Sequence, residues 1–125
     1  MNINVPDNPN PAPNYMYSAT FADPLNLDAN DSNAFYCLLT GNTTLNLLNT
    51  RRGATYLIQL NMDGVGGHTV TLGDIFRGAV VGTGSIVTTA NAVNFITVVR
   101  GAGGYLSYNI INVTVTATTT TTTTT

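Results

Sequence analysis

The residues that could do chemistry in this chain are few: one histidine, one cysteine, six aspartates and four arginines, with no glutamate and no lysine. His68 is the only histidine, and the nearest acids in the sequence are Asp63 and Asp74. A metal site or a proton-transfer site needs companion residues at spacings such as HxH or HxxE, and none surrounds His68. We therefore expect His68 to be a polar residue at a strand edge, not a catalytic group.

Cys37, the single cysteine, lies within the apolar run Ala34–Leu39. A lone cysteine cannot form a disulfide within its own chain, and no histidine or acid follows at a spacing typical of an activated nucleophile. In apolar surroundings a thiol behaves as a small hydrophobic group. The sequence therefore predicts a core position for Cys37.

Half of the acids, Asp23, Asp28 and Asp31, gather in the stretch 22–33. Calcium takes six to eight oxygen ligands, but the EF-hand register with its central glycine and terminal glutamate is missing. Aspartate and asparagine also close turns by bonding their own backbone, and we expect that role here. The glycines at 64–67 and 101–104 lack the lysine and the helix of a phosphate loop. We predict no catalytic residue, no cofactor and no metal, and hence no enzyme.

The elements that would position these residues are strands. In the stretch 55–62, Tyr56, Ile58, Leu60 and Met62 share one face of an alternating pattern. A glycine-rich break at 63–67 follows, and a second alternation then places Val70 and Leu72 on one face. Because glycine takes positive φ without a Cβ clash, period two on both sides of such a break predicts a β-hairpin with these residues in the core.

The rest of the chain also favours strands, since threonine, valine, isoleucine and tyrosine suit them and the strong helix formers glutamate and lysine are missing. Only residues 74–77 could form one short helical turn. Short strands with turns between them predict an all-β fold, a single antiparallel β-sandwich or small barrel. The further strands are expected at 15–21, 35–39, 43–48, 90–99 and 105–116, with a loop at 22–33.

The two ends of the chain differ from this pattern. We predict an extended arm at 1–14, rich in proline and asparagine, a β domain at 15–116 and a threonine tail at 117–125. The arm is either disordered or laid along a neighbouring subunit. The tail is expected to lie along another chain or to add a strand to a neighbouring edge. The alternative is that its threonines stand in for residues of another identity.

Charged residues make up 8% of the chain, against about a quarter in a typical soluble domain. We expect much of the outer surface to be covered by copies of the chain or by a partner. A net charge of −2 gives no electrostatic reason to bind nucleic acid. The N-terminus does not have the pattern of a secretory signal, and no apolar run approaches the roughly 20 residues that span a bilayer. Neither nucleic acid nor a membrane is therefore an expected partner.

The central stretch also resembles a small β domain of tailed bacteriophages, found in tail-fibre, minor-tail and capsid-decoration proteins. The shared pattern is a strand, a D-G-x-G-G turn, x-T-V-T, a short loop, T-T-A-N-A-V-N-F and a closing glycine-rich strand start. This chain departs from the family pattern in the closing strand, where Leu106 replaces an aromatic residue. The residues that carry the resemblance are Asp63, Gly64, Gly66, Gly67, Thr69, Val70, Thr71, Thr88, Thr89, Ala90, Asn91, Ala92, Val93 and Tyr105.

The resemblance implies a structural protein of the virion, most simply a capsid decoration (cement) protein that binds and stabilises the capsid surface as a homotrimer. Its partners would be copies of itself and the major capsid protein or another virion protein. The alternative is a tail-fibre or receptor-binding domain that contacts the host surface through loops such as 73–85. The expected partner-binding residues are Val5, Pro6, Pro9, Pro11, Pro13, Tyr15, Phe76, Thr118 and Thr120.

Overall fold

The computed structural model describes residues 16–79 and 81–114, which form nine strands, one helical turn and one 3-10 turn. Within these ranges no helix is long and apolar enough to cross a membrane. In chain order the elements are β1 (Tyr17–Ser18), β2 (Leu25–Asp28), β3 (Ala34–Leu39), β4 (Thr43–Leu48), β5 (Thr55–Met62), β6 (Val70–Leu72), α1 (Asp74–Arg77), β7 (Val81–Thr83), β8 (Val93–Arg100), η1 (Ala102–Gly104) and β9 (Leu106–Val113).

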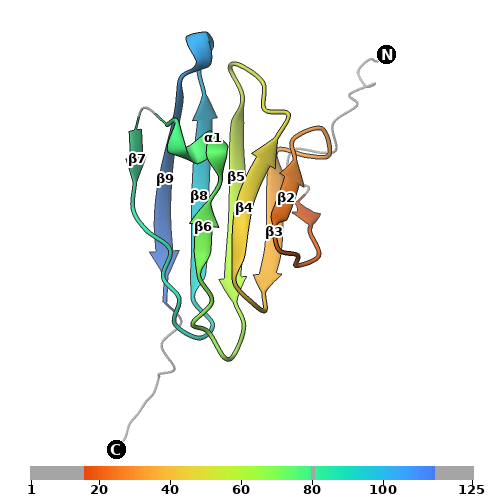
Figure 1. Cartoon of the computed structure of the whole chain (residues 1–125), viewed down its shortest axis with the longest axis vertical. Helices are drawn as coiled ribbons and strands as arrows, with labels where there is room; N and C mark the ends of the chain where they lie inside the picture. The colour runs from red at the N-terminus through yellow and green to blue at the C-terminus, as the bar shows by residue number, and fades with distance from the viewer. Residues whose placement is uncertain (1–15, 80, 115–125) are drawn as a thin grey trace, which may run out of the picture.

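The strands form two sheets that face each other. The larger sheet has six strands in the order β1-β3-β5-β8-β9-β7, and the smaller has three in the order β2-β4-β6. In Figure 1 the small sheet and α1 lie in front of the large sheet. The small sheet and α1 thus cover one face of the large sheet.

The path of the chain between the sheets is that of a short β-solenoid. From β1 to β6 successive strands alternate between the large and the small sheet, and strands that share a sheet pair in parallel. Three coils therefore stack side by side. After β6 the solenoid path ends. Strand β8 pairs antiparallel with both β5 and β9, and β7 pairs in parallel with β9 at the edge of the large sheet.

This topology corrects the predicted fold. The chain is all-β, but the prediction of a single antiparallel sandwich or small barrel is wrong. The sheets contain both parallel and antiparallel pairs, and the strands from β1 to β6 follow the path of a solenoid. The predicted hairpin is wrong for the same reason: β6 pairs with β4 in the other sheet and not with β5. Seven residues separate Met62 from Val70, enough to cross the roughly 10 Å between packed sheets. Glycine breaks between alternating runs fit such a coil corner as well as they fit a hairpin.

The core lies between the two sheets and follows the period of two along each strand. In β5 the buried side chains are Tyr56, Ile58, Leu60 and Met62, and the residues between them face the other way. The apolar alternation of β5 thus sets its orientation, as predicted. The remaining buried apolar side chains are Leu25, Leu27, Phe35, Cys37, Leu39, Leu45, Leu47, Phe76, Ala92, Ile96, Val98, Leu106 and Ile110.

One buried polar group ties the segment before β8 to the sheet. The side chain of Asn94 is fully buried; its Oδ1 accepts a bond of 2.8 Å from the Val87 amide and its Nδ2 donates one of 3.0 Å to the Val87 carbonyl. Asn112 donates to the same Oδ1 at 2.6 Å and to the Ser85 carbonyl at 2.9 Å. Since each of these buried groups has a partner, the cost of burying an amide is offset.

Most predicted strands are confirmed, for example 43–48, which matches β4. The predicted helical turn at 74–77 is confirmed as α1. The stretch 22–33, expected to be only a loop, contains β2. The predicted arm at 1–14 and the whole predicted tail at 117–125 lie outside the described residues, so the domain boundaries stay predictions.

Candidate functional site

The structure brings His68 and Asp63 together, a pair that the sequence spacing did not suggest. His68 Nε2 lies 2.9 Å from Asp63 Oδ1. The same oxygen accepts hydrogen bonds from the amides of Val65 and Gly66. The bond from Gly66 contributes most to holding the pKa of Asp63 below its ordinary value, with His68 and Val65 adding to the effect. The carboxylate therefore organises the 63–68 corner.

The other candidates for chemistry have structural roles. Cys37 is fully buried, and burial raises the pKa of its thiol to about 11. Asp28 accepts bonds from the side chain of Asn49 and from the amide of Asn30, and these bonds lower its pKa. Within the part of the chain that the structure describes, no group of three or more histidine, cysteine or acidic residues could hold a metal ion.

Phe76 does not have the exposure that a contact residue in a loop needs. It is 3% exposed and packs edge-on against Tyr108, with ring centroids 5.5 Å apart. Helix α1 thus uses Phe76 to close the core, whereas the sequence predicts this residue to bind a partner. The other predicted contact residues, Val5, Pro6, Pro9, Pro11, Pro13, Tyr15, Thr118 and Thr120, lie outside the described residues.

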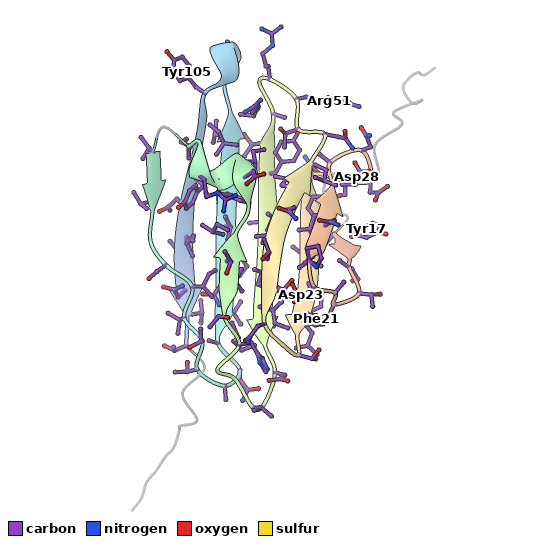
Figure 2. The ribbon with its side chains drawn as sticks, in the orientation of Figure 1. Tyr17, Phe21, Asp23, Asp28, Arg51 and Tyr105 are labelled. Carbon is purple, nitrogen blue, oxygen red and sulfur yellow. The ribbon has the colours of Figure 1, made fainter. Side chains whose placement is uncertain are left out.

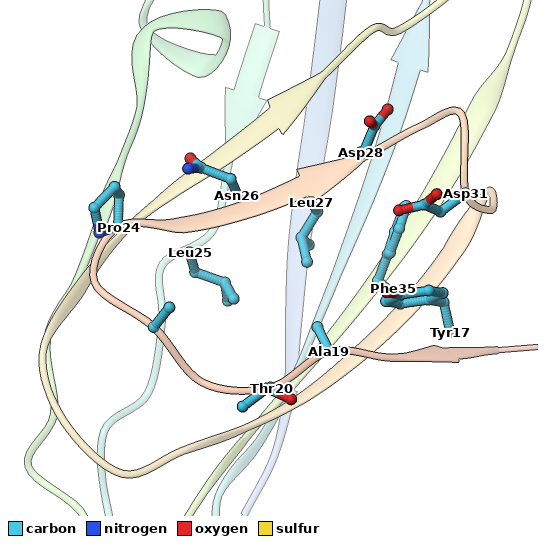
Figure 3. A pocket seen from close by; sticks show the side chains of 11 residues that line it. Tyr17, Ala19, Thr20, Pro24, Leu25, Asn26, Leu27, Asp28, Asp31 and Phe35 are labelled. Carbon is cyan, nitrogen blue, oxygen red and sulfur yellow. The ribbon is translucent and has the colours of Figure 1, made fainter.

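A pocket of about 310 Å³ opens where β1 and β2 form the first coil. Leu25 and Leu27 point into the space between β2 and the chain segment after β1, whereas Asn26 and Asp28 point outward (Figure 3). Tyr17 and Phe35 line one side with an edge-to-face contact. The pocket is the open side of the solenoid, where no further coil among the described residues continues the two sheets.

A candidate surface is the face of the six-stranded sheet that points away from the small sheet, which we call the outer face. Strand register places its side chains in four rows that run across the sheet. The rows are Thr55, Val99, Ser107 and Val81; Ala34, Leu57, Thr97, Asn109 and Thr83; Ser18, Tyr36, Gln59, Phe95 and Ile111; and Leu38, Asn61, Val93 and Val113.

None of these outer-face residues is charged, and several large apolar side chains on it are exposed, among them Leu38, Val99, Ile111 and Val113. The matching surface of the small sheet is different. It presents Asn26, Thr44, Asn46 and Thr71, with Asp28 at the end of β2, and one exposed leucine, Leu48. In the described part of the chain, the outer surface of the small sheet is thus mainly polar, whereas the outer face of the large sheet carries no charge and mixes polar with apolar side chains.

The comparison with protein families gives this arrangement a context. A family model described as "Putative phage tail fibre C-terminal domain" matches residues 14–105, which include every element from β1 to η1. The chain belongs to this tail-fibre family. No curated protein and no solved structure matches it.

Family membership confirms the predicted resemblance to phage virion proteins. The protein is a structural protein of a phage virion, in a family of structural domains. The preferred function, capsid decoration, finds no support in this family, which fits the tail-fibre alternative better. The two unusual ends of the chain do not distinguish a shell protein from a fibre domain.

Proposed function

We propose that this protein is a tail-fibre domain, carried on the tail of the virion and not on the capsid, where it contacts the host surface. The observation that carries the proposal is the family match over residues 14–105, which spans all three coils and β8. A rigid core between two sheets, with aspartates and asparagines used for turns and pairing, supports a role in binding and architecture.

The proposal includes association with copies of the same chain as a homotrimer. Its support is the low share of charged residues, 8%, together with an outer face that carries no charge in the described strands. Contact with the host would use loops at the ends of the sheets. In segment 73–85 the exposed side chains of Asp74 and Arg77 are the ones to test, because Phe76 is buried.

Labelling of intact particles tests the position. An antibody raised against the purified protein, visualised with gold by electron microscopy, should decorate the tail fibres. Label on the capsid shell with bare fibres would overturn the proposal. A second assay adds the purified protein to host cells before the phage, and a host-contacting domain should then slow adsorption.

A further inference from the structure

We propose that the outer face of the six-stranded sheet is the surface through which copies of this chain associate. The inference rests on the self-association within the proposed function and deepens it by naming the face. It does not depend on where in the virion the protein sits. Four features of the face support it: the absence of charge, the area, the composition, and a hollow with an adjacent aromatic side chain.

No charged side chain lies in the rows of the outer face. Asp23, Asp28 and Asp31 flank the small sheet, and Arg51 and Arg52 lie in the turn before β5. Figure 2 shows Asp28 beside β2, a strand of the small sheet. An acidic or basic partner would gain no ion pair on the outer face. A second copy of the chain offers an uncharged surface of the same composition, which is the complement that this face needs.

The area of the face suits one specific interface. Strands β5, β8 and β9 have eight residues each, so each extends roughly 26 Å at about 3.3 Å per residue. Six strands at a spacing of about 4.8 Å would be nearly as wide, although β1 and β7 are short. The face therefore offers on the order of 600 Å², close to the roughly 800 Å² that each partner buries in a standard interface.

The composition of the face matches the core of an interface between subunits. One row crosses it with Tyr36, Gln59, Phe95 and Ile111 side by side on β3, β5, β8 and β9. Aromatic and aliphatic groups thus flank a single amide. Such a row can bury apolar area against a copy, and the amide keeps a partner within the chain, because Gln59 Nε2 donates to Asn61 Oδ1 at 3.0 Å.

One end of the face has a hollow with a projecting aromatic beside it. The hollow, of about 290 Å³, is lined by Val81, Val99 and Ser107 of the outer face and by Tyr105. Tyr105 is 63% exposed and points away from the sheets (Figure 2). An exposed tyrosine next to an apolar hollow has the properties of an interface anchor, because its ring can fill a hollow on a partner while its hydroxyl stays solvated.

The test uses the full chain and sedimentation velocity over a concentration series. The substitutions are Ile111→Lys, which puts a charge at a side chain that is 56% exposed on the outer face, and Tyr105→Ser, which lies outside the strands and leaves their pairing intact. The matched control is Leu48→Lys, at a leucine that is 43% exposed on the small sheet. Circular dichroism checks the fold of each variant.

We expect the wild type to be oligomeric. Ile111→Lys and Tyr105→Ser should each raise the dissociation constant of the oligomer by about tenfold or more, and Leu48→Lys should leave it unchanged. A wild type that stays monomeric would overturn self-association and this inference together. An oligomer that both outer-face variants leave intact, or that Leu48→Lys weakens as much, would overturn the inference alone. If Ile111→Lys does not fold, Tyr105→Ser decides between these outcomes.

Discussion

The side-chain amide of Asn46 donates a hydrogen bond of 2.8 Å to Oδ1 of Asn26, across two parallel strands of the small sheet. The two asparagines occupy the same position in consecutive coils, within the repeated triplet Leu-Asn-Leu at 25–27 and 45–47. Asn49, which directly follows β4, donates a hydrogen bond of 2.9 Å to Asp28 Oδ1 between the same two coils. Polar side chains stacked from coil to coil thus hold the register on the solvent side, while the leucines hold it on the core side.

This ladder predicts a measurable coupling between the two asparagines. Asn26→Ala and Asn46→Ala should each destabilise the domain, and a double-mutant cycle should give a coupling of about 0.5–1 kcal/mol, the usual net value of one hydrogen bond. Urea unfolding of the four proteins measures it. Additive effects within error would mean that the bond does not contribute to stability.

The corner at 63–68 predicts a large loss of stability for substitution of one glycine and a small change for substitution of another. Gly66 has φ of +70°, and a Cβ added there would lie 2.5 Å from the backbone nitrogen of Ala90. Gly66→Ala should therefore cost about 1–3 kcal/mol of unfolding free energy. Gly64→Ala is the matched control, because a Cβ there meets nothing within 4 Å and its change in stability should be small. Equal effects in the two variants would contradict the described corner.

Removal of the buried amide of Asn94 should be costly. Asn94→Leu keeps the volume roughly constant but leaves the amide and the carbonyl of Val87 without the bonds that Asn94 now makes with them. We expect a loss of about 1–3 kcal/mol by thermal or urea unfolding. Thr71→Ala, at an exposed position of the small sheet, serves as the control and should change stability far less. A neutral Asn94→Leu would show that segment 84–90 is held by its other contacts.

Cys37 should be inert in the folded protein and reactive in the unfolded one. A thiol-specific reagent such as DTNB at neutral pH should label it only after denaturant is added, since burial shields the sulfur and disfavours the thiolate. The folded-state pKa is about 11, raised from 9.0. The protonated thiol therefore contributes stability that is fully present below pH 9.0 and is lost as pH rises toward 11. Rapid labelling of the native protein at neutral pH would contradict this assignment.

The sequence predicted local structure well and topology poorly. The alternation of Tyr56, Ile58, Leu60 and Met62 gave both the strand β5 and its buried face. A period of two does not say which strand lies alongside, so the pattern predicts a hairpin turn at 63–69 where the structure has a coil corner. Strand β2 was missed because its two leucines stand among aspartates and asparagines. The repeat of Leu-Asn-Leu twenty residues apart was the available signal for a coil.

The candidate surface could not be predicted from the sequence, for a related reason. The low total charge predicted a covered surface, but only the register between strands shows that Tyr36, Gln59 and Phe95 lie side by side. Phe76 illustrates the converse. Its place in a loop suggested exposure, whereas α1 turns it inward against Tyr108.

The position of the protein in the virion is the central claim, and imaging of intact particles at subunit resolution tests it most directly. We predict density in the tail fibres that fits two facing sheets of six and three strands, with outer faces turned toward one another. Density for this domain on the capsid shell, with none in the fibres, would contradict the account.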